Sequence, residues 1–209
     1  MKAIKGIDCT KALPMEHILR KWLKCIARVT ESWAQFKDLP WWYNERADIS
    51  VLAGAVWKSG ELAVEEFVSE KRRISRKTGK LSRRFNGRID LYFSVKGQHF
   101  VAEAKDCWSG AGDESTDPTF KIGKSLQKAL WDIKKVRSYG DRKLAILFAK
   151  PVLPAKKKKD AARLIKRWLR LVRTMEFDAV AWYFPESARH IRWKNRKTYP
   201  GVAILIKEK

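Results

Sequence analysis

The chain has 209 residues, 45% of them hydrophobic, so it can bury one substantial core and is not intrinsically disordered. No apolar run approaches the roughly 18 residues that span a membrane, and the N-terminus MKAIKGIDCTKALP lacks the apolar segment and cleavage site of a secretory signal. Three widely spaced cysteines, Cys9, Cys25 and Cys107, argue against a disulfide framework and a structural zinc site. We therefore expect one cytoplasmic domain with reduced thiols.

The net charge is the strongest global signal. The sequence has 46 Lys and Arg against 23 Asp and Glu, which gives +23 and a pI near 10.1. A folded chain with this excess is expected to bind a polyanion, and nucleic acid is favoured because each neutralised phosphate releases counterions. An anionic membrane surface is the weaker alternative, because the basic residues are spread along the chain rather than gathered in one amphipathic helix.

Hydrophobic periodicity predicts two helices in the first part of the chain. Apolar residues recur at helical spacing over Met15–Phe36, and a second helix is expected over Glu45–Ser59, with Asp48 or Ser50 as its cap. A charged strand should follow from Glu66, with a turn at Thr78–Gly79 leading into the next strand.

The stretch GRIDLYFSVKGQHFVAEAKD, residues 87–106, alternates as a half-buried hairpin with its turn at Val95–Gln98. Residues 108–119 are rich in Gly, Ser, Asp and Pro and are expected to form a loop. Beyond this loop the pattern predicts helices over 120–136 and 160–175, and strands over 143–148, 178–184 and 202–206. This order predicts an α/β fold in which helices flank a mixed sheet.

Three charged residues interrupt the apolar hairpin. Asp90 lies on its first strand, and Glu103 and Lys105 lie on the second. Because side chains alternate along a strand, Glu103 and Lys105 share a face, and the antiparallel partner can bring Asp90 opposite them. Two carboxylates suit Mg²⁺, which commonly keeps water and phosphate among its ligands, and the carbonyl of Ala104 could serve as a further ligand. An ammonium at Lys105 could orient the attacking water or stabilise phosphate.

Asp90 followed by Glu103-Ala104-Lys105 resembles the Asp…Glu-x-Lys signature of the PD-(D/E)xK nuclease superfamily. The resemblance implies a restriction-endonuclease-like αβββαβ core and Mg²⁺-dependent phosphodiester hydrolysis, with Mn²⁺ able to substitute. The chain departs from the pattern at Ile89, where many members have Pro. The resemblance implies a catalytic core at 45–150, a helical extension at 1–44 and an αββ extension at 151–209 that completes the sheet.

The resemblance also implies further site residues. Members often add an acidic residue from the first core helix, which points to Glu45 as a third carboxylate that binds the metal or as the holder of a second metal. Glu61, Glu65 and Glu66 are weaker substitutes; alternatively, Glu45 only favours its helix N-terminus. The helix after the catalytic strands often supplies a polar residue, so Lys124, Gln127 and Lys128 are candidates.

The motif is short, so its context matters. An acidic residue followed two positions later by Lys occurs only at Glu103, Asp132 and Asp141. Asp132 is expected in a helix, where such residues diverge, and Asp141 in a turn, which leaves Glu103. The competing interpretation is that Asp90 and Lys105 form a buried salt bridge that braces the sheet.

Basic segments beside the motif are candidates for binding nucleic acid, with DNA favoured over RNA. They are Lys71, Arg72, Arg73, Arg76, Lys77, Lys80, Arg83 and Arg84, then Lys124 and Gln127, and finally Arg192, Lys194 and Arg196. Two other functions remain open: a non-catalytic nucleic-acid-binding subunit of a larger assembly, and a structural protein of an RNA–protein particle. A homodimer would suit cleavage of both strands, but the sequence shows no dimer interface.

Overall fold

The computed structural model describes residues 3–75, 78, 81–112, 117–137, 141–154, 159–191 and 197–209. Its helices are α1 (Glu16–Trp33), α2 (Glu45–Trp57), α3 (Thr119–Lys135) and α4 (Ala161–Arg173). Its strands are β1 (Ile4–Cys9), β2 (Ala63–Ile74), β3 (Leu81–Val95), β4 (Gln98–Gly110), β5 (Arg142–Pro154), β6 (Ala179–Phe184), β7 (Lys197–Thr198) and β8 (Val202–Glu208).

The strands form a mixed sheet in the order β1-β6-β8-β5-β4-β3-β2, with β7 paired to the end of β5. Only β4 and β5 run parallel, connected through α3, while the other neighbours are antiparallel. The α/β fold with a mixed sheet flanked by helices is therefore confirmed.

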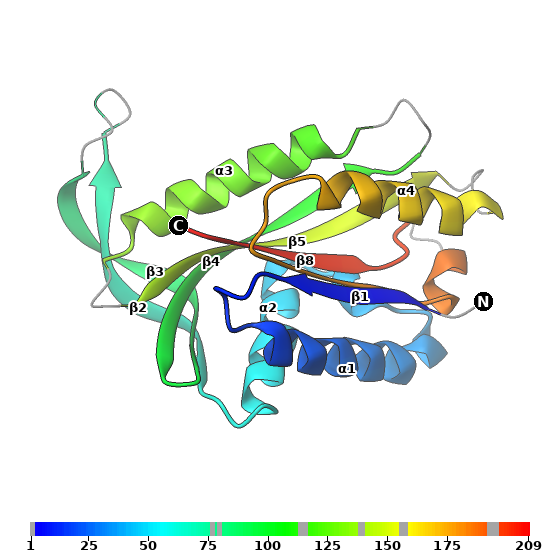
Figure 1. Cartoon of the computed structure of the whole chain (residues 1–209), viewed down its shortest axis with the longest axis horizontal. Helices are drawn as coiled ribbons and strands as arrows, with labels where there is room; N and C mark the ends of the chain where they lie inside the picture. Colours follow the sequence, from blue (N-terminus) through cyan, green and yellow to red (C-terminus); the bar gives the residue numbers. More distant parts are fainter. Residues whose placement is uncertain are drawn as a thin grey trace.

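Helices cover both faces of this sheet, α1 and α2 on one side and α3 and α4 on the other (Figure 1). Alternation along β5 shows why: Leu144, Ile146 and Phe148 pack towards α1 and α2, while Ala145, Leu147 and Ala149 pack towards α3 and α4. No helix in the described part of the chain is long and apolar enough to cross a membrane.

The element order α2-β2-β3-β4-α3-β5 agrees with the αβββαβ order expected from the sequence. Three local predictions were wrong. The N-terminal segment contains a strand, β1, as well as α1; β4 continues through Trp108 to Gly110, where a loop was expected; and α2 is capped by Asn44, not Asp48 or Ser50. Asn44 accepts a hydrogen bond from the Ala47 amide, whereas Asp48 lies within α2 with its side chain buried.

The predicted hairpin turn is present, with Lys96 and Gly97 at positive φ angles of 50° and 73°. From this turn β3 and β4 pair only as far as Leu91 opposite Ala102. Beyond that point β4 continues beside β5, whereas β3 continues beside β2 into an arm that stands away from the sheet at the left of Figure 1. The two strands therefore form a fork. Gly79, in the turn predicted at the end of this arm, lies outside the described residues.

Candidate active site at the fork between β3 and β4

Asp90 is the first residue of β3 beyond the fork. Its Oδ2 accepts a hydrogen bond of 2.7 Å from the Ala104 amide, so the side chain takes the place of a ladder carbonyl. On its other side, Glu65 pairs with Leu91 and Phe67 with Ile89, while Glu66 between them has a φ of 49°. The backbone of β3 is thus irregular at Asp90, and its carboxylate is directed at β4.

Glu103 and Lys105 lie on β4 directly across the fork, on the face covered by α3. Lys105 Nζ donates to the Ala104 carbonyl at 2.7 Å and lies 3.4 Å from Asp132 Oδ2 on α3. Burial alone would lower the pKa of Lys105, but the charges of Glu45, Asp90, Asp132 and Glu103 raise it. Lys105 therefore stays an ammonium and is a proton donor or electrostatic group, not a base.

Glu45 reaches the same place from the first turn of α2. Its Oε2 accepts a hydrogen bond of 3.3 Å from the Asp106 amide on β4. Burial raises the pKa of Glu45, the nearby Lys105 charge lowers it, and the charges of Asp90 and Asp106 add to the rise. Glu45, for which the sequence analysis left open a role in helix stability alone, therefore lies within electrostatic reach of Lys105 on β4.

Glu103 is 4% exposed and is paired with Lys71 of β2, whose Nζ lies 2.5 Å from Glu103 Oε1. Lys71 reaches across β3 at Gly87, where an added Cβ would lie 2.7 Å from Lys71 Cδ. Burial and the charge of Asp90 nevertheless raise the pKa of Glu103. The site thus holds more carboxylate charge than Lys71 and Lys105 offset.

A second charged cluster lies near Glu45, on the face of the sheet that α1 and α2 cover. Lys150 of β5 is fully buried, with Nζ 2.7 Å from Asp48 Oδ2 and 2.8 Å from Asp106 Oδ1. The ammonium also lies 4.7 Å from the ring centre of Trp108. Burial raises the pKa of Asp48 to about 7, because one ammonium cannot fully offset two carboxylates. This cluster fixes α2 against β4 and β5 and so places Glu45.

The structure distributes the predicted nucleic-acid-binding residues unevenly. Lys71 is mostly buried, with its side chain 12% exposed in the ion pair with Glu103, and Arg72 is partly exposed. Arg73, Arg83, Arg84, Lys124 and Gln127 are exposed. The remaining candidates lie outside the described residues: Arg76, Lys77, Lys80, Arg192, Lys194 and Arg196.

Two expectations about neighbours of the motif need correction. The α3 residue that contacts Lys105 is Asp132, which sequence reasoning set aside, while Lys124, Gln127 and Lys128 are exposed on α3. The proposed Asp90–Lys105 salt bridge is also not formed: both residues are described, and Lys105 is paired with Asp132. Helical spacing could have placed Asp132 near the sheet, since it adjoins the buried Ile133 and follows the buried Ala129 by three residues. The sequence around Asp132 gives no sign that it pairs with Lys105.

The oxygen donors around the fork are of the type that a hard divalent cation binds, but they are not gathered around one point. Among the described residues, no three His, Cys, Asp or Glu side chains are gathered closely enough to hold a metal ion. The available oxygen donors are the carboxylates of Asp90, Glu103 and Glu45 and the carbonyl of Ala104, the type that Mg²⁺ prefers together with water and phosphate. Their uncompensated negative charge favours a cation, although Lys71 occupies one oxygen of Glu103.

Comparisons of the chain with models of known protein families, with curated proteins and with solved structures found no match. The case for a function therefore depends on the fork itself.

Replacing Lys150 with Met should lower the free energy of unfolding by about 3–5 kcal/mol, because Asp48 and Asp106 would be left buried without a cation. Denaturant unfolding of Lys150→Met and of the exposed control Lys24→Met measures this. Adding Asp48→Asn should recover part of the loss. A loss below about 1 kcal/mol for Lys150→Met would contradict the inferred role of the cluster.

The raised pKa of Asp48 predicts a specific pH dependence. A carboxyl whose folded pKa is raised stabilises the protein at low pH, and that stability is lost as the pH rises towards about 7. The free energy of unfolding should therefore fall by up to about 1 kcal/mol per pH unit between about pH 5 and 7. Asp48→Asn should flatten this decline; an identical slope in the variant would show that other groups cause it.

Proposed function

We propose that this protein is a metal-dependent nuclease that hydrolyses phosphodiester bonds, with DNA as the favoured substrate. The observation that carries the proposal is that Asp90, Glu103 and Lys105 lie together at the β3–β4 fork. The charge of Asp90 raises the pKa of both Glu103 and Lys105, and the charges of Glu103 and Lys105 act on each other. The element order α2-β2-β3-β4-α3-β5 supports membership of a PD-(D/E)xK-type group.

The fork residues take distinct roles in this proposal. Lys105, held as an ammonium between Ala104 O and Asp132, would donate to the attacking water or to a phosphate oxygen. Glu45 is half-buried, and burial raises its pKa, which makes it a stronger base than an exposed carboxylate and suits it to accept a proton from that water. Asp90, Glu103 and the Ala104 carbonyl would hold the metal.

A bound Mg²⁺ or Mn²⁺ would neutralise charge on the phosphate and lower the pKa of bound water. The chain's own residues supply the frame for this chemistry. Asp90 is oriented by the Ala104 amide, and Glu45 is oriented by the Asp106 amide. Both amides belong to β4, so one rigid strand sets the positions of both carboxylates.

One observation favours a second function, a nucleic-acid-binding subunit without catalysis. The Lys71 ammonium is already paired with Glu103 and satisfies part of the charge that a metal would otherwise neutralise. In that case the fork would be a structural ion-pair network. Cleavage assays distinguish the two functions.

The nuclease proposal predicts that Glu103→Gln and Lys105→Met each reduce metal-dependent cleavage by at least about 100-fold. The assay uses supercoiled plasmid, linear duplex, single-stranded DNA and RNA with Mg²⁺, Mn²⁺ or EDTA. Melting curves check that the variants are folded, and exposed Lys24→Met is the matched control. Cleavage of every substrate at wild-type rate by Glu103→Gln, or its persistence in EDTA, would refute the proposal.

Lys71 provides a prediction that does not depend on turnover. Because its ammonium competes for Glu103, Lys71→Met should bind Mn²⁺ about three- to tenfold more tightly than wild type. Electron paramagnetic resonance of free Mn²⁺ measures this without nucleic acid, with Lys24→Met as control. Unchanged or weaker affinity in Lys71→Met would mean that Glu103 is not a metal ligand.

A further inference from the structure

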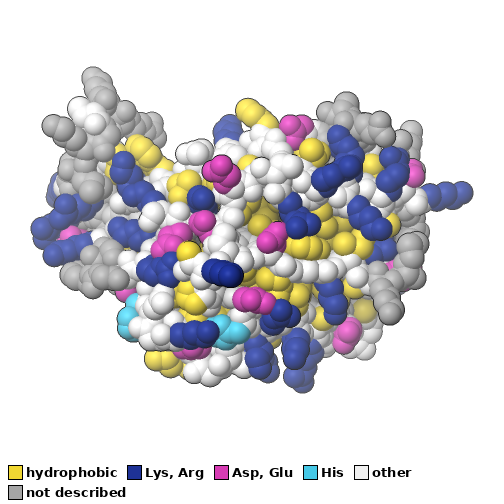
Figure 2. All heavy atoms as spheres, viewed as in Figure 1, with side chains coloured by type: hydrophobic (Ala, Val, Ile, Leu, Met, Phe, Trp, Pro, Cys, Tyr) yellow, Lys and Arg dark blue, Asp and Glu magenta, His cyan; other side chains and the backbone are white. Residues whose placement is uncertain are grey.

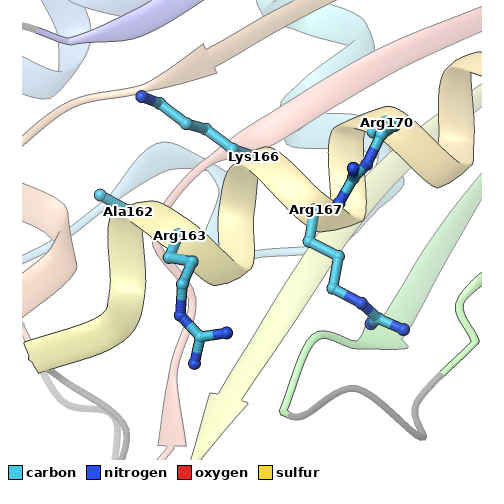
Figure 3. A pocket seen from close by; sticks show the side chains of 5 residues that line it. All are labelled: Ala162, Arg163, Lys166, Arg167 and Arg170. Carbon is cyan, nitrogen blue, oxygen red and sulfur yellow. The ribbon is translucent and has the colours of Figure 1, made fainter.

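Helix α4 carries a surface that neither the motif nor the fork explains. Within its 13 residues it has Arg163, Lys166, Arg167, Arg170 and Arg173 and no acidic residue. Four of these, with Ala162, line a surface hollow of about 900 Å³ (Figure 3). We call Arg163, Lys166, Arg167 and Arg170 the α4 basic surface. Lys and Arg side chains gather over α4 in the upper right of Figure 2.

The spacing of the cations on α4 lowers the intrinsic stability of the helix. Arg163 is three residues from Lys166 and four from Arg167, and Arg170 is similarly spaced from both. Like charges at these spacings destabilise a helix by about 0.2–0.5 kcal/mol per pair. Arg163 lies 3.7 Å from Asp160, but both side chains are about half exposed, so this pair offsets little of the repulsion. The cations of α4 therefore repel one another, and a polyanion bound along them would relieve this repulsion.

The buried side of α4 excludes insertion into a membrane. Leu164, Ile165, Trp168, Leu169 and Val172 are all buried against the sheet, in the core shared with α3. A helix that binds a lipid surface by insertion needs its apolar face for the acyl boundary. The fully exposed residues of α4, which are Arg163, Lys166, Arg170 and Arg173, are all cationic and suit a polyanion in water.

The spacing of the cations fits a phosphate backbone. From Arg163 to Arg170 the helix rises about 10.5 Å. A strand of duplex DNA places one phosphate per about 3.4 Å of axis, so this length matches about three phosphate-to-phosphate steps along a duplex that lies parallel to the helix. Three of the four cations are Arg, whose planar guanidinium can hold two phosphate oxygens at once. In Figure 3, Arg163 and Arg167 point to one side of α4 and Lys166 to the other.

The location of α4 relative to the fork is also suitable. α4 and α3 cover the same face of the sheet, the face on which Lys105 meets Asp132. Hydrogen bonds from Thr119 and, more weakly, the charge of Arg167 lower the pKa of Asp117, just before α3. Arg167 of α4 is therefore within electrostatic reach of Asp117, and the exposed side of α3 that follows carries Lys121, Lys124 and Lys128.

We propose that the α4 basic surface binds the sugar–phosphate backbone of the nucleic acid and extends the interface beyond the fork along the layer of α3 and α4. The inference rests on the proposed function only for the identity of the polyanion.

Binding in EDTA tests the inference separately from cleavage. A fluorescein-labelled DNA duplex of about 20 base pairs is titrated at several KCl concentrations between about 50 and 300 mM, and anisotropy gives Kd. The variant Arg163→Gln/Arg167→Gln/Arg170→Gln is compared with Lys21→Gln/Lys24→Gln/Arg28→Gln, which removes equal charge from the exposed side of α1 on the opposite face of the sheet. Lys166→Gln/Arg170→Gln is the fallback if the triple variant melts early.

We expect the α4 triple variant to weaken binding at least tenfold. The slope of log K against log [salt] should fall by about 2 to 3, roughly 0.9 for each phosphate that the variant no longer neutralises. The α1 variant should change Kd less than about threefold, since it affects only long-range attraction, which salt screens. Equal weakening in both variants would refute the inference, because net charge alone would explain it. So would normal DNA binding by the α4 variant, or binding of polyglutamate but not DNA by wild type.

Outcomes for the two proposals are separable. Loss of DNA binding in the α4 variant without any cleavage by wild type would leave the surface assigned and the nuclease proposal refuted. Metal-dependent cleavage by wild type with unchanged binding in the α4 variant would give the opposite result.

Discussion

The separation of β3 from β4 at Asp90 is the constraint on which the candidate site depends. A continuous ladder would place carbonyls and amides where the fork places side chains. Because pairing stops at Leu91 and Ala102, the amide of Ala104 needs another acceptor, and Asp90 supplies it. The opening also admits Glu45 from one face of the sheet and Lys71 over Gly87 from β2. The site is thus a consequence of β4 losing β3 as a neighbour while it stays paired with β5 on its other side.

Acidic side chains gather at the fork, although the chain as a whole is strongly basic. A protein with a net charge of +23 places Glu45, Asp90, Glu103 and Asp132 around Lys105 and buries Asp48 and Asp106 around Lys150. Burying carboxylates is costly unless cations compensate them, and the raised pKa values of Glu45 and Glu103 indicate that compensation is incomplete. Carboxylates with raised pKa values beside a specific cationic partner are a feature of functional sites more than of bracing ion pairs. Lys150 complements this arrangement from behind, because it holds α2 in the position that brings Glu45 to β4.

Local periodicity was sufficient to predict the hairpin, the shared face of Glu103 and Lys105, and the α/β order, because each depends on residues close in sequence. It could not predict interactions made by long side chains between distant elements. Lys71 was assigned to a basic run because its neighbours are basic. Its ammonium instead pairs with Glu103, which lies 32 residues after Lys71, because Gly87 has no side chain to block the contact. Asp132 was set aside because it lies on a helix, yet packing of α3 on β4 brings it to Lys105. β1 was missed because IKGIDC is short and its pairing partner β6 lies about 170 residues later.

Net charge alone is a poor guide to which cations can meet a polyanion. Lys71, Lys105 and Lys150 are committed to carboxylates within the fold, and their ammonium groups are mostly buried. The cations of α4 have the opposite character, since the apolar side of that helix supplies its stability and leaves the charged side exposed to solvent. The basic composition of the sequence therefore covers two groups of cations: internal lysines that pair with buried carboxylates, and arginines on the surface of α4, for which we propose a role in binding phosphate. A substitution in the first group should alter the chemistry at the fork or the stability, while one in the second should alter affinity and its dependence on salt.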